Sequence, residues 1–177
     1  MTGAKIRETA QLMTNVVIHP SASLRFINEA ISKMVEQESG AGRLEHEEIQ
    51  VTDTDEVYEL QKDLLRLEKI THERDGEISK KHCVILGNGV KFPLKGKHTV
   101  SYWTYPSEVI DEETKLEMAR PFHHAIACYV AYKESLRLYG STHNDTTMFL
   151  SMYHAEFMNA TARLKRQKPR YIKPYFS

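Results

Sequence analysis

Apolar residues recur at helical spacing towards both ends of the chain and change to short runs in its middle. Near the start, Ile6, Ala10 and Met13 predict a short amphipathic helix, and a second apolar stripe predicts a helix that ends before "ESGAGR". In the last third, two wider stripes predict two long antiparallel helices joined by the short segment "STHND". The three longer stripes are Leu24, Ile27, Ile31, Met34 and Val35; Phe122, Ile126, Tyr129, Val130 and Leu136; and Phe149, Tyr153, Phe157, Ala160 and Leu164.

The middle of the chain, from about Glu47 to Tyr105, has the texture of β structure. The stretch "CVILGNGVKFPL" places two apolar runs around Gly87-Asn88-Gly89, a composition typical of a tight turn between antiparallel strands. It is followed by "HTVSYWTYP", which is rich in β-branched and aromatic residues and ends at Pro106. These segments predict three strands.

Two segments carry mixed signals. In "YELQKDLLRLEKITHERDGE" the leucines suit either a helix or a strand, and the Asp75-Gly76 pair favours a strand for the second half. After Pro106, the acids Asp111, Glu112 and Glu113 suit a helix amino terminus, where they complement the helix dipole. We therefore expect strand structure before Gly76 and the start of a helix after Pro106.

Together these patterns predict an α+β protein that is mainly α. We expect a helical bundle with a small antiparallel β subdomain, about residues 47–105, inserted between the second and third helices. Residues 1–167 would form one domain, and residues 168–177 an extended carboxyl-terminal segment. A chain of 177 residues is long enough for one domain with a small insertion.

The composition is that of an ordinary globular protein, with 41% hydrophobic and 27% charged residues. No apolar run approaches the roughly 20 residues of a membrane span, and the amino terminus lacks the apolar run of a secretory signal. We therefore expect a soluble protein with no membrane partner that folds in the cytoplasm, with Cys83 and Cys128 unpaired. The formal net charge of zero argues against a general nucleic-acid coat.

The polar residues do not form the motif of a known reaction. His124 and Cys128 are four positions apart on a predicted helix, with His154 on the partner helix, but a tetrahedral zinc site needs a fourth ligand. The Gly87-Asn88-Gly89 turn lacks the lysine and the helix start of a phosphate-binding loop. We therefore expect no catalytic residues, no metal and no cofactor.

The last residues, "RLKRQKPRYIKPYFS", contain no acid and combine positive charge with aromatic side chains. Pro169 and Pro174 interrupt both helix and sheet pairing, so this tail does not fold alone. A frayed terminus is one interpretation. The other is an extended anchor that becomes ordered on a partner surface.

The order of these elements resembles that of the head-to-tail adaptor proteins of tailed bacteriophages, also called connector or head-completion proteins. The similarity lies in "LRFINEAI" near the start, in a β region that closes with "YWTYP", and above all in "RPFHHAIACYVAYKESLRLYGSTHNDTTMFLSMYHAEFMNATARLK". The β region is larger than in the minimal all-helical adaptors.

The resemblance implies a structural virion protein without a catalytic role, made in the host cytoplasm and located at the head–tail junction. Neighbouring copies would form a ring, dodecameric in form, beneath the portal protein. The ring would surround the channel through which genomic DNA passes, and it would present a platform to a tail or stopper protein. The tail residues expected to bind the portal are Arg163, Lys165, Arg166, Lys168, Arg170, Tyr171, Ile172, Lys173, Tyr175 and Phe176.

Two alternatives belong to other functional classes. A small regulatory or nucleic-acid-binding module could use the basic tail to contact phosphate, which predicts salt-sensitive DNA binding. A metal-dependent enzyme could use His123, His124, Cys128 and His154. The adaptor is the leading hypothesis because the chain combines a long helical hairpin with an anchor-like tail.

Overall fold

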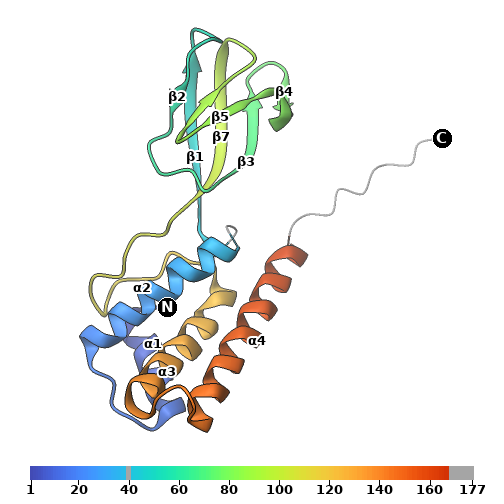
Figure 1. Cartoon of the computed structure of the whole chain (residues 1–177). Coiled ribbons are helices and arrows are strands. Elements are labelled where there is room, and N and C mark those ends of the chain that lie inside the picture. The colour runs from blue at the N-terminus through green and yellow to red at the C-terminus, as the bar shows by residue number, and fades with distance from the viewer. Residues whose placement is uncertain (39–40, 168–177) are drawn as a thin grey trace, which may run out of the picture. The chain divides into compact units, whose positions relative to one another are not determined.

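A computed structural model of the chain describes residues 1–38 and 41–167. The chain divides into two compact units, one formed by Met1–Ile31 with Glu108–Ser177 and the other by Ser32–Ser107. We call the first the helical unit and the second the β unit (Figure 1).

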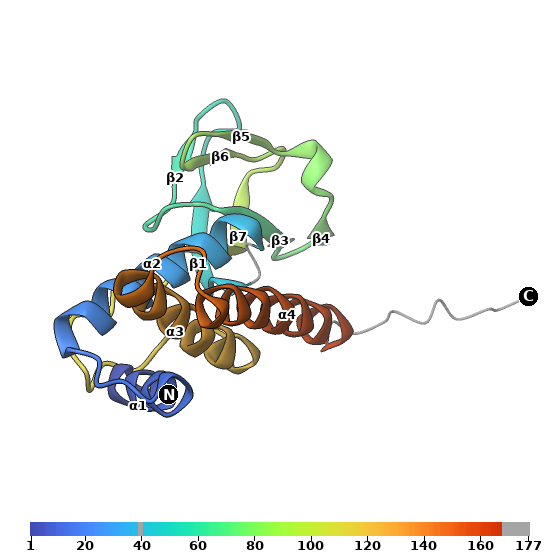
Figure 2. The same ribbon diagram turned by 60° about the horizontal axis from the view of Figure 1, so that its bottom comes forward.

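The helical unit is organised around one central helix, α3 (His123–Tyr139). Every residue from Ala125 to Ala131 is buried, which is typical of a helix covered on all sides. Helix α3 lies between α1 (Gly3–Thr14) and α4 (Asn144–Gln167), as Figures 1 and 2 show. The predicted hairpin of two long helices is confirmed as α3 and α4. None of the described helices combines the length and apolarity needed to cross a bilayer.

Two further elements complete the helical unit. Helix α2 (Pro20–Gln37) contributes its first part, including the buried Phe26 and Ile27. A single turn of 3-10 helix, η3 (Arg120–Phe122), leads directly into α3 and contacts α4.

The helix expected after Pro106 does not form, and this prediction is wrong. The segment before η3 is irregular because its acids bond to other groups. The Asp111 carboxylate accepts hydrogen bonds from the Thr114 amide at 2.6 Å and its hydroxyl at 2.7 Å. Such local side-chain bonds compete with helix formation. The Glu112 carboxylate accepts from the Arg7 guanidinium, with 3.0 Å between Nη2 and Oε2, and fastens this segment to α1.

The β unit contains two antiparallel sheets. The larger has the order β1-β7-β3-β4, with β1 Arg43–Val51, β7 Gly96–Thr104, β3 Arg66–His72 and β4 Gly76–Ile78. The smaller has the order β2-β6-β5, with β2 Tyr58–Glu59, β6 Gly89–Lys91 and β5 Val84–Leu86. A short 3-10 turn, η2 (Lys80–His82), precedes β5. The strands predicted before Gly76 and around Gly87-Asn88-Gly89 are confirmed.

Both sheets contribute to one hydrophobic core within the β unit. Val100 and Ile70, neighbours on β7 and β3, are fully buried, and Val90 of the smaller sheet joins the same cluster. Alternation along the strands explains this arrangement, since every second side chain of a strand points to the same face. Phe92 and Leu60, which lie outside the strands, are buried in the same cluster.

The predicted fold class is therefore wrong. Helices account for 47% of the residues and strands for 23%, and the strands form two sheets instead of one small insertion in a mainly helical bundle. The prediction missed β1, which begins at Arg43, because Glu45, Glu47 and Glu48 interrupt its apolar residues. With β1 included, the β unit has a core of its own.

The hairpin between β5 and β6 also anchors a separate loop. Gly87 has a φ of 58° at the first turn position, which suits a two-residue turn that begins with glycine. The side chain of Asn88 accepts from the Leu64 amide at 2.6 Å and donates to the Leu60 carbonyl at 2.9 Å. The turn residue thus holds the loop that follows β2.

Candidate assembly surfaces

The residues considered for a metal site do not converge. His123 is buried, and its Nε2 lies 3.1 Å from the Met118 carbonyl oxygen, whereas His124 and His154 are exposed. Burial raises the pKa of the Cys128 thiol to about 11, which keeps it protonated and a poor metal ligand. Within residues 1–38 and 41–167, no group of three or more His, Cys, Asp or Glu side chains could hold a metal ion.

The outer face of α4 is unusual for an exposed helix because it carries almost no charge. Between Thr147 and Ala162 the single charged residue is Glu156, which is half-buried. Met158 is 66% exposed and Met148 is 48% exposed. The exposed residues of this face are Thr147, Met148, Ser151, His154, Ala155, Met158, Asn159 and Ala162. We call this set the α4 outer face. Exposed methionines with few charges are typical of protein–protein interfaces.

A basic end follows the α4 outer face. Arg163, Lys165 and Arg166 lie on the last turns of α4 and are exposed, where cations complement the negative end of the helix dipole. Three of the ten predicted portal-binding residues therefore lie on the last helix, within the predicted domain of residues 1–167. The other seven, Lys168, Arg170, Tyr171, Ile172, Lys173, Tyr175 and Phe176, lie outside the described residues.

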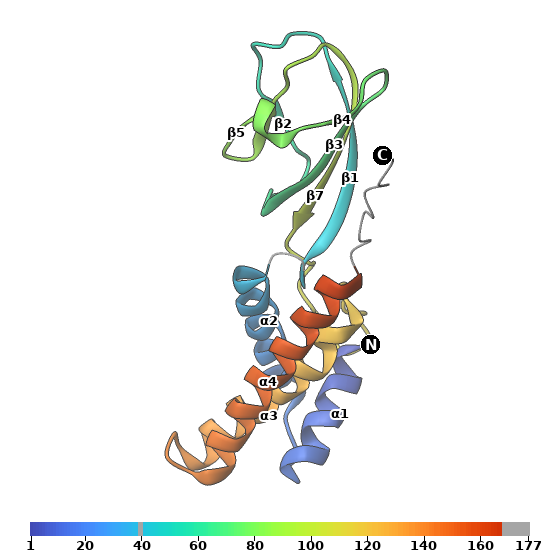
Figure 3. The same cartoon turned by 90° about the vertical axis from the view of Figure 1, so that its right-hand side faces the viewer.

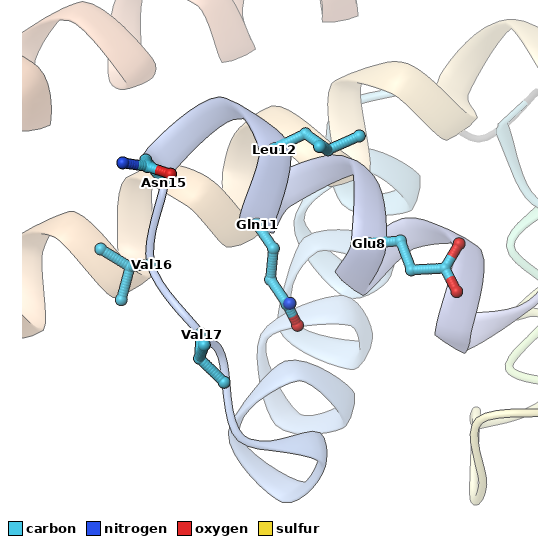
Figure 4. A pocket seen from close by; sticks show the side chains of 6 residues that line it. All are labelled: Glu8, Gln11, Leu12, Asn15, Val16 and Val17. Atoms are coloured by element: carbon cyan, nitrogen blue, oxygen red, sulfur yellow. The ribbon is translucent and has the colours of Figure 1, made fainter.

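A second weakly charged surface lies at the end of α1. A surface hollow there is lined by Glu8, Gln11, Leu12, Asn15, Val16 and Val17, and Figure 4 shows these side chains around the last turn of α1 and the loop after it. Leu12 is 86% exposed and Val17 is 84% exposed. Asn15 ends the helix in the left-handed conformation, with a φ of 52°, and so turns the chain back towards the hollow. We call this surface the α1 hollow.

Contacts with α3 hold α4 in place. The buried hydroxyls of Ser135 and Thr146 are 2.9 Å apart and close the α3–α4 hairpin. The Phe122 and Phe157 rings, 5.9 Å apart, pack at the opposite end of that hairpin. Because α3 lies between α1 and α4, the α1 hollow and the α4 outer face belong to different sides of the helical unit (Figure 2).

The aromatic residues of the hairpin are mostly core. Phe122, Tyr129, Phe149, Tyr153 and Phe157 are buried, Tyr132 is half-buried, and Tyr139 is 51% exposed and stacks on His143. Tyr139 is therefore the one ring among these seven that is exposed. The exposed Met148, Met158 and Leu12 were not among the residues predicted to bind a partner. The shortage of charge in "TMFLSMYHAEFMNATA" is the sequence signal that could have indicated the α4 outer face.

Comparison with known proteins does not assign the chain to a family. No protein-family model matches it, and no curated protein matches it.

Proposed function

We propose that the protein is a head-to-tail adaptor of a tailed bacteriophage, a structural protein that forms a ring beneath the portal. The observation that carries the proposal is the α4 outer face, with Met158 66% exposed and no charged residue exposed between Thr147 and Ala162. Burying such a surface costs little free energy, because no charge has to leave water. It is suited to contact another protein subunit.

The position of the two surfaces supports a ring. A contact between the α4 outer face of one copy and the α1 hollow of the next uses different patches on the two partners. Contacts of this kind repeat, and they close into a ring when the rotation between copies allows it. Leu12 and Val17 offer apolar area to the exposed methionines, and Gln11 and Asn15 offer uncharged polar groups.

The positive charge at the end of α4 favours the portal protein as the partner of the carboxyl-terminal segment. Arg163, Lys165 and Arg166 place positive charge directly before residues 168–177, which add three more cations and four large apolar side chains. An acidic portal surface with aromatic pockets would match this chemistry. Repetition around a ring multiplies a weak contact at each copy. The remaining partners in this proposal are a tail or stopper protein and the genomic DNA in the channel.

Quantitative mass spectrometry of purified phage particles tests the proposal. We expect the protein in the virion, with a copy number close to that of the portal protein and cross-links from Lys165 and Lys168 to the portal. Absence from the particle would refute the adaptor. Salt-sensitive DNA binding that is lost on deletion of the residues after Arg163 would then favour the regulatory module.

A further inference from the structure

Strand β5 is an exposed edge strand with an apolar sequence. It pairs with β6 on one side and, within the described part of the chain, with no strand on the other. Its three side chains are all about half exposed: Val84 51%, Ile85 47% and Leu86 53%. Figure 3 shows β5 at the margin of the β unit. Edge strands are usually protected from pairing by lysine, proline or a bulge, and β5 contains none of these.

One residue of β5 directs its backbone groups outwards. In an antiparallel pair, alternate residues exchange hydrogen bonds with the partner strand, and the residues between them point their N–H and C=O away from it. The two-residue turn at Gly87 and Asn88 closes on the Leu86–Gly89 pair, so the next pair, Ile85 with Val90, is of the second kind. The N–H and C=O of Ile85 therefore face the open edge.

The surroundings of this edge are basic. The turn η2 places Lys80, Lys81 and His82 before β5, and Lys91 lies opposite Val84 on β6. Lys80 Nζ donates to the Leu67 carbonyl at 2.9 Å, and Lys91 pairs with Asp55 at 3.0 Å. Lys81 and His82 are exposed. The carboxyl-terminal tail of the chain is itself basic, so like-charge repulsion disfavours it as an occupant.

We propose that β5 is a docking edge for an extended, acidic segment of a partner protein, which adds to the β2-β6-β5 sheet as a further strand. The backbone of Ile85 would supply one pair of hydrogen bonds. Val84 and Leu86, which share one face of the sheet, would pack against alternate apolar side chains of the added segment. Acids between those side chains would face Lys81 and His82. This inference goes beyond the proposed ring and does not depend on it.

Two capped peptides test the proposal against the full-length protein. The first alternates valine with glutamate, Glu-Val-Glu-Val-Glu-Val-Glu, and the second has lysine in place of glutamate. Binding is followed by amide NMR shifts and by hydrogen exchange. We expect the acidic peptide to shift and protect the amides of Val84–Leu86, and to bind at least about tenfold more tightly than the basic peptide. Equal binding of both peptides, or shifts confined to β1, would overturn the proposal.

Variants at one position separate backbone pairing from side-chain contact. Ile85→Pro removes the outward N–H without removing a hydrogen bond to β6, and proline is tolerated at such edge positions. The variant should therefore not bind the acidic peptide. Ile85→Thr keeps that N–H and should retain measurable binding. Lys81→Glu should weaken binding of the acidic peptide and leave the fold intact, so it tests the proposal even if Ile85→Pro unfolds.

Two outcomes with these variants would contradict the proposal. One is wild-type binding by a folded Ile85→Pro variant. The other is protection of the β5 amides that rises with protein concentration when no peptide is present, because this would show pairing between copies of the chain instead of docking of an acidic partner.

Discussion

The hydroxyl of Tyr129 donates a hydrogen bond to the Glu29 carboxylate at 2.6 Å and ties α3 to α2 inside the helical unit. Lys133 Nζ reaches the same oxygen at 3.0 Å. Burial, and then the bond to Glu29, raise the pKa of the Tyr129 hydroxyl, so it stays protonated and remains the donor. This contact joins segments 100 positions apart in the sequence.

Removing that hydroxyl should destabilise the helical unit. Tyr129→Phe leaves the Glu29 carboxylate without one of its donors, and we expect the free energy of unfolding to fall by about 1–2 kcal/mol in urea titrations. The matched control is Tyr139→Phe, which removes the hydroxyl of a tyrosine that is 51% exposed and should change stability by about 0.5 kcal/mol or less. Equal losses in the two variants would show that the bond to Glu29 does not stabilise the unit.

Asn88 should contribute more to stability than a turn residue ordinarily does. Asn88→Gly keeps a residue suited to the turn and removes the side chain that bonds Leu60 and Leu64. We expect a loss of about 1–2 kcal/mol and faster hydrogen exchange at the Leu64 amide. The control is Asn88→Asp, which keeps the side-chain oxygen that accepts a hydrogen bond from the Leu64 amide. Unchanged exchange at Leu64 in Asn88→Gly would contradict the prediction.

His98 should make the β unit less stable in acid. Its ring is fully buried between His72 and Phe92, with Nδ1 3.2 Å from the Gly96 carbonyl oxygen. Burial, and to a lesser degree the neighbouring His72, lower the pKa of His98, although the Gly96 carbonyl and Glu73 act in the opposite direction. The unfolded chain therefore binds a proton below about pH 6.5 that the folded chain does not, and stability falls as the pH drops through that value.

Urea titrations at about pH 7.5 and about pH 5.5 test this pH dependence. The fluorescence of Trp103, the only tryptophan, reports unfolding of the β unit. This signal distinguishes the effect of His98 from that of His123, whose pKa is also lowered by burial but which lies in the helical unit. His98→Phe should reduce the loss of stability in acid, and the exposed-site control His82→Gln should not. A pH dependence that is the same in wild type and His98→Phe would refute the assignment.

A charge on the α4 outer face should prevent assembly without unfolding the subunit. Met158 is 66% exposed, so Met158→Lys should change the free energy of unfolding by about 0.5 kcal/mol or less. When purified protein is added to particles that lack it, we expect the variant to be incorporated at least about tenfold less than wild type, because a buried unpaired lysine is costly. The copy number relative to the portal protein is measured by mass spectrometry.

The control for this experiment adds the same charge elsewhere on the helical unit. Thr142 is exposed in the loop between α3 and α4, so Thr142→Lys should be incorporated like wild type. Normal incorporation of Met158→Lys would remove the α4 outer face from the proposed interface.

The sequence by itself determined the elements whose signal is local. The apolar stripes of α2, α3 and α4 follow the period of the helix, and the turn between β5 and β6 is specified by its own glycines. The basic end of α4 could likewise be identified from composition, and the predicted domain of residues 1–167 already included it.

Only the tertiary structure decided the rest, because it depends on residues far apart in the chain. Strand β1 has acids among its apolar residues and is a strand because β7 pairs with it along its length. The acids after Pro106 bond to Thr114 and Arg7 instead of starting a helix. Which methionine and leucine side chains of α1 and α4 remain exposed depends on how these helices pack against α3. Burial and pairing are properties of the folded chain, and a local pattern does not contain them.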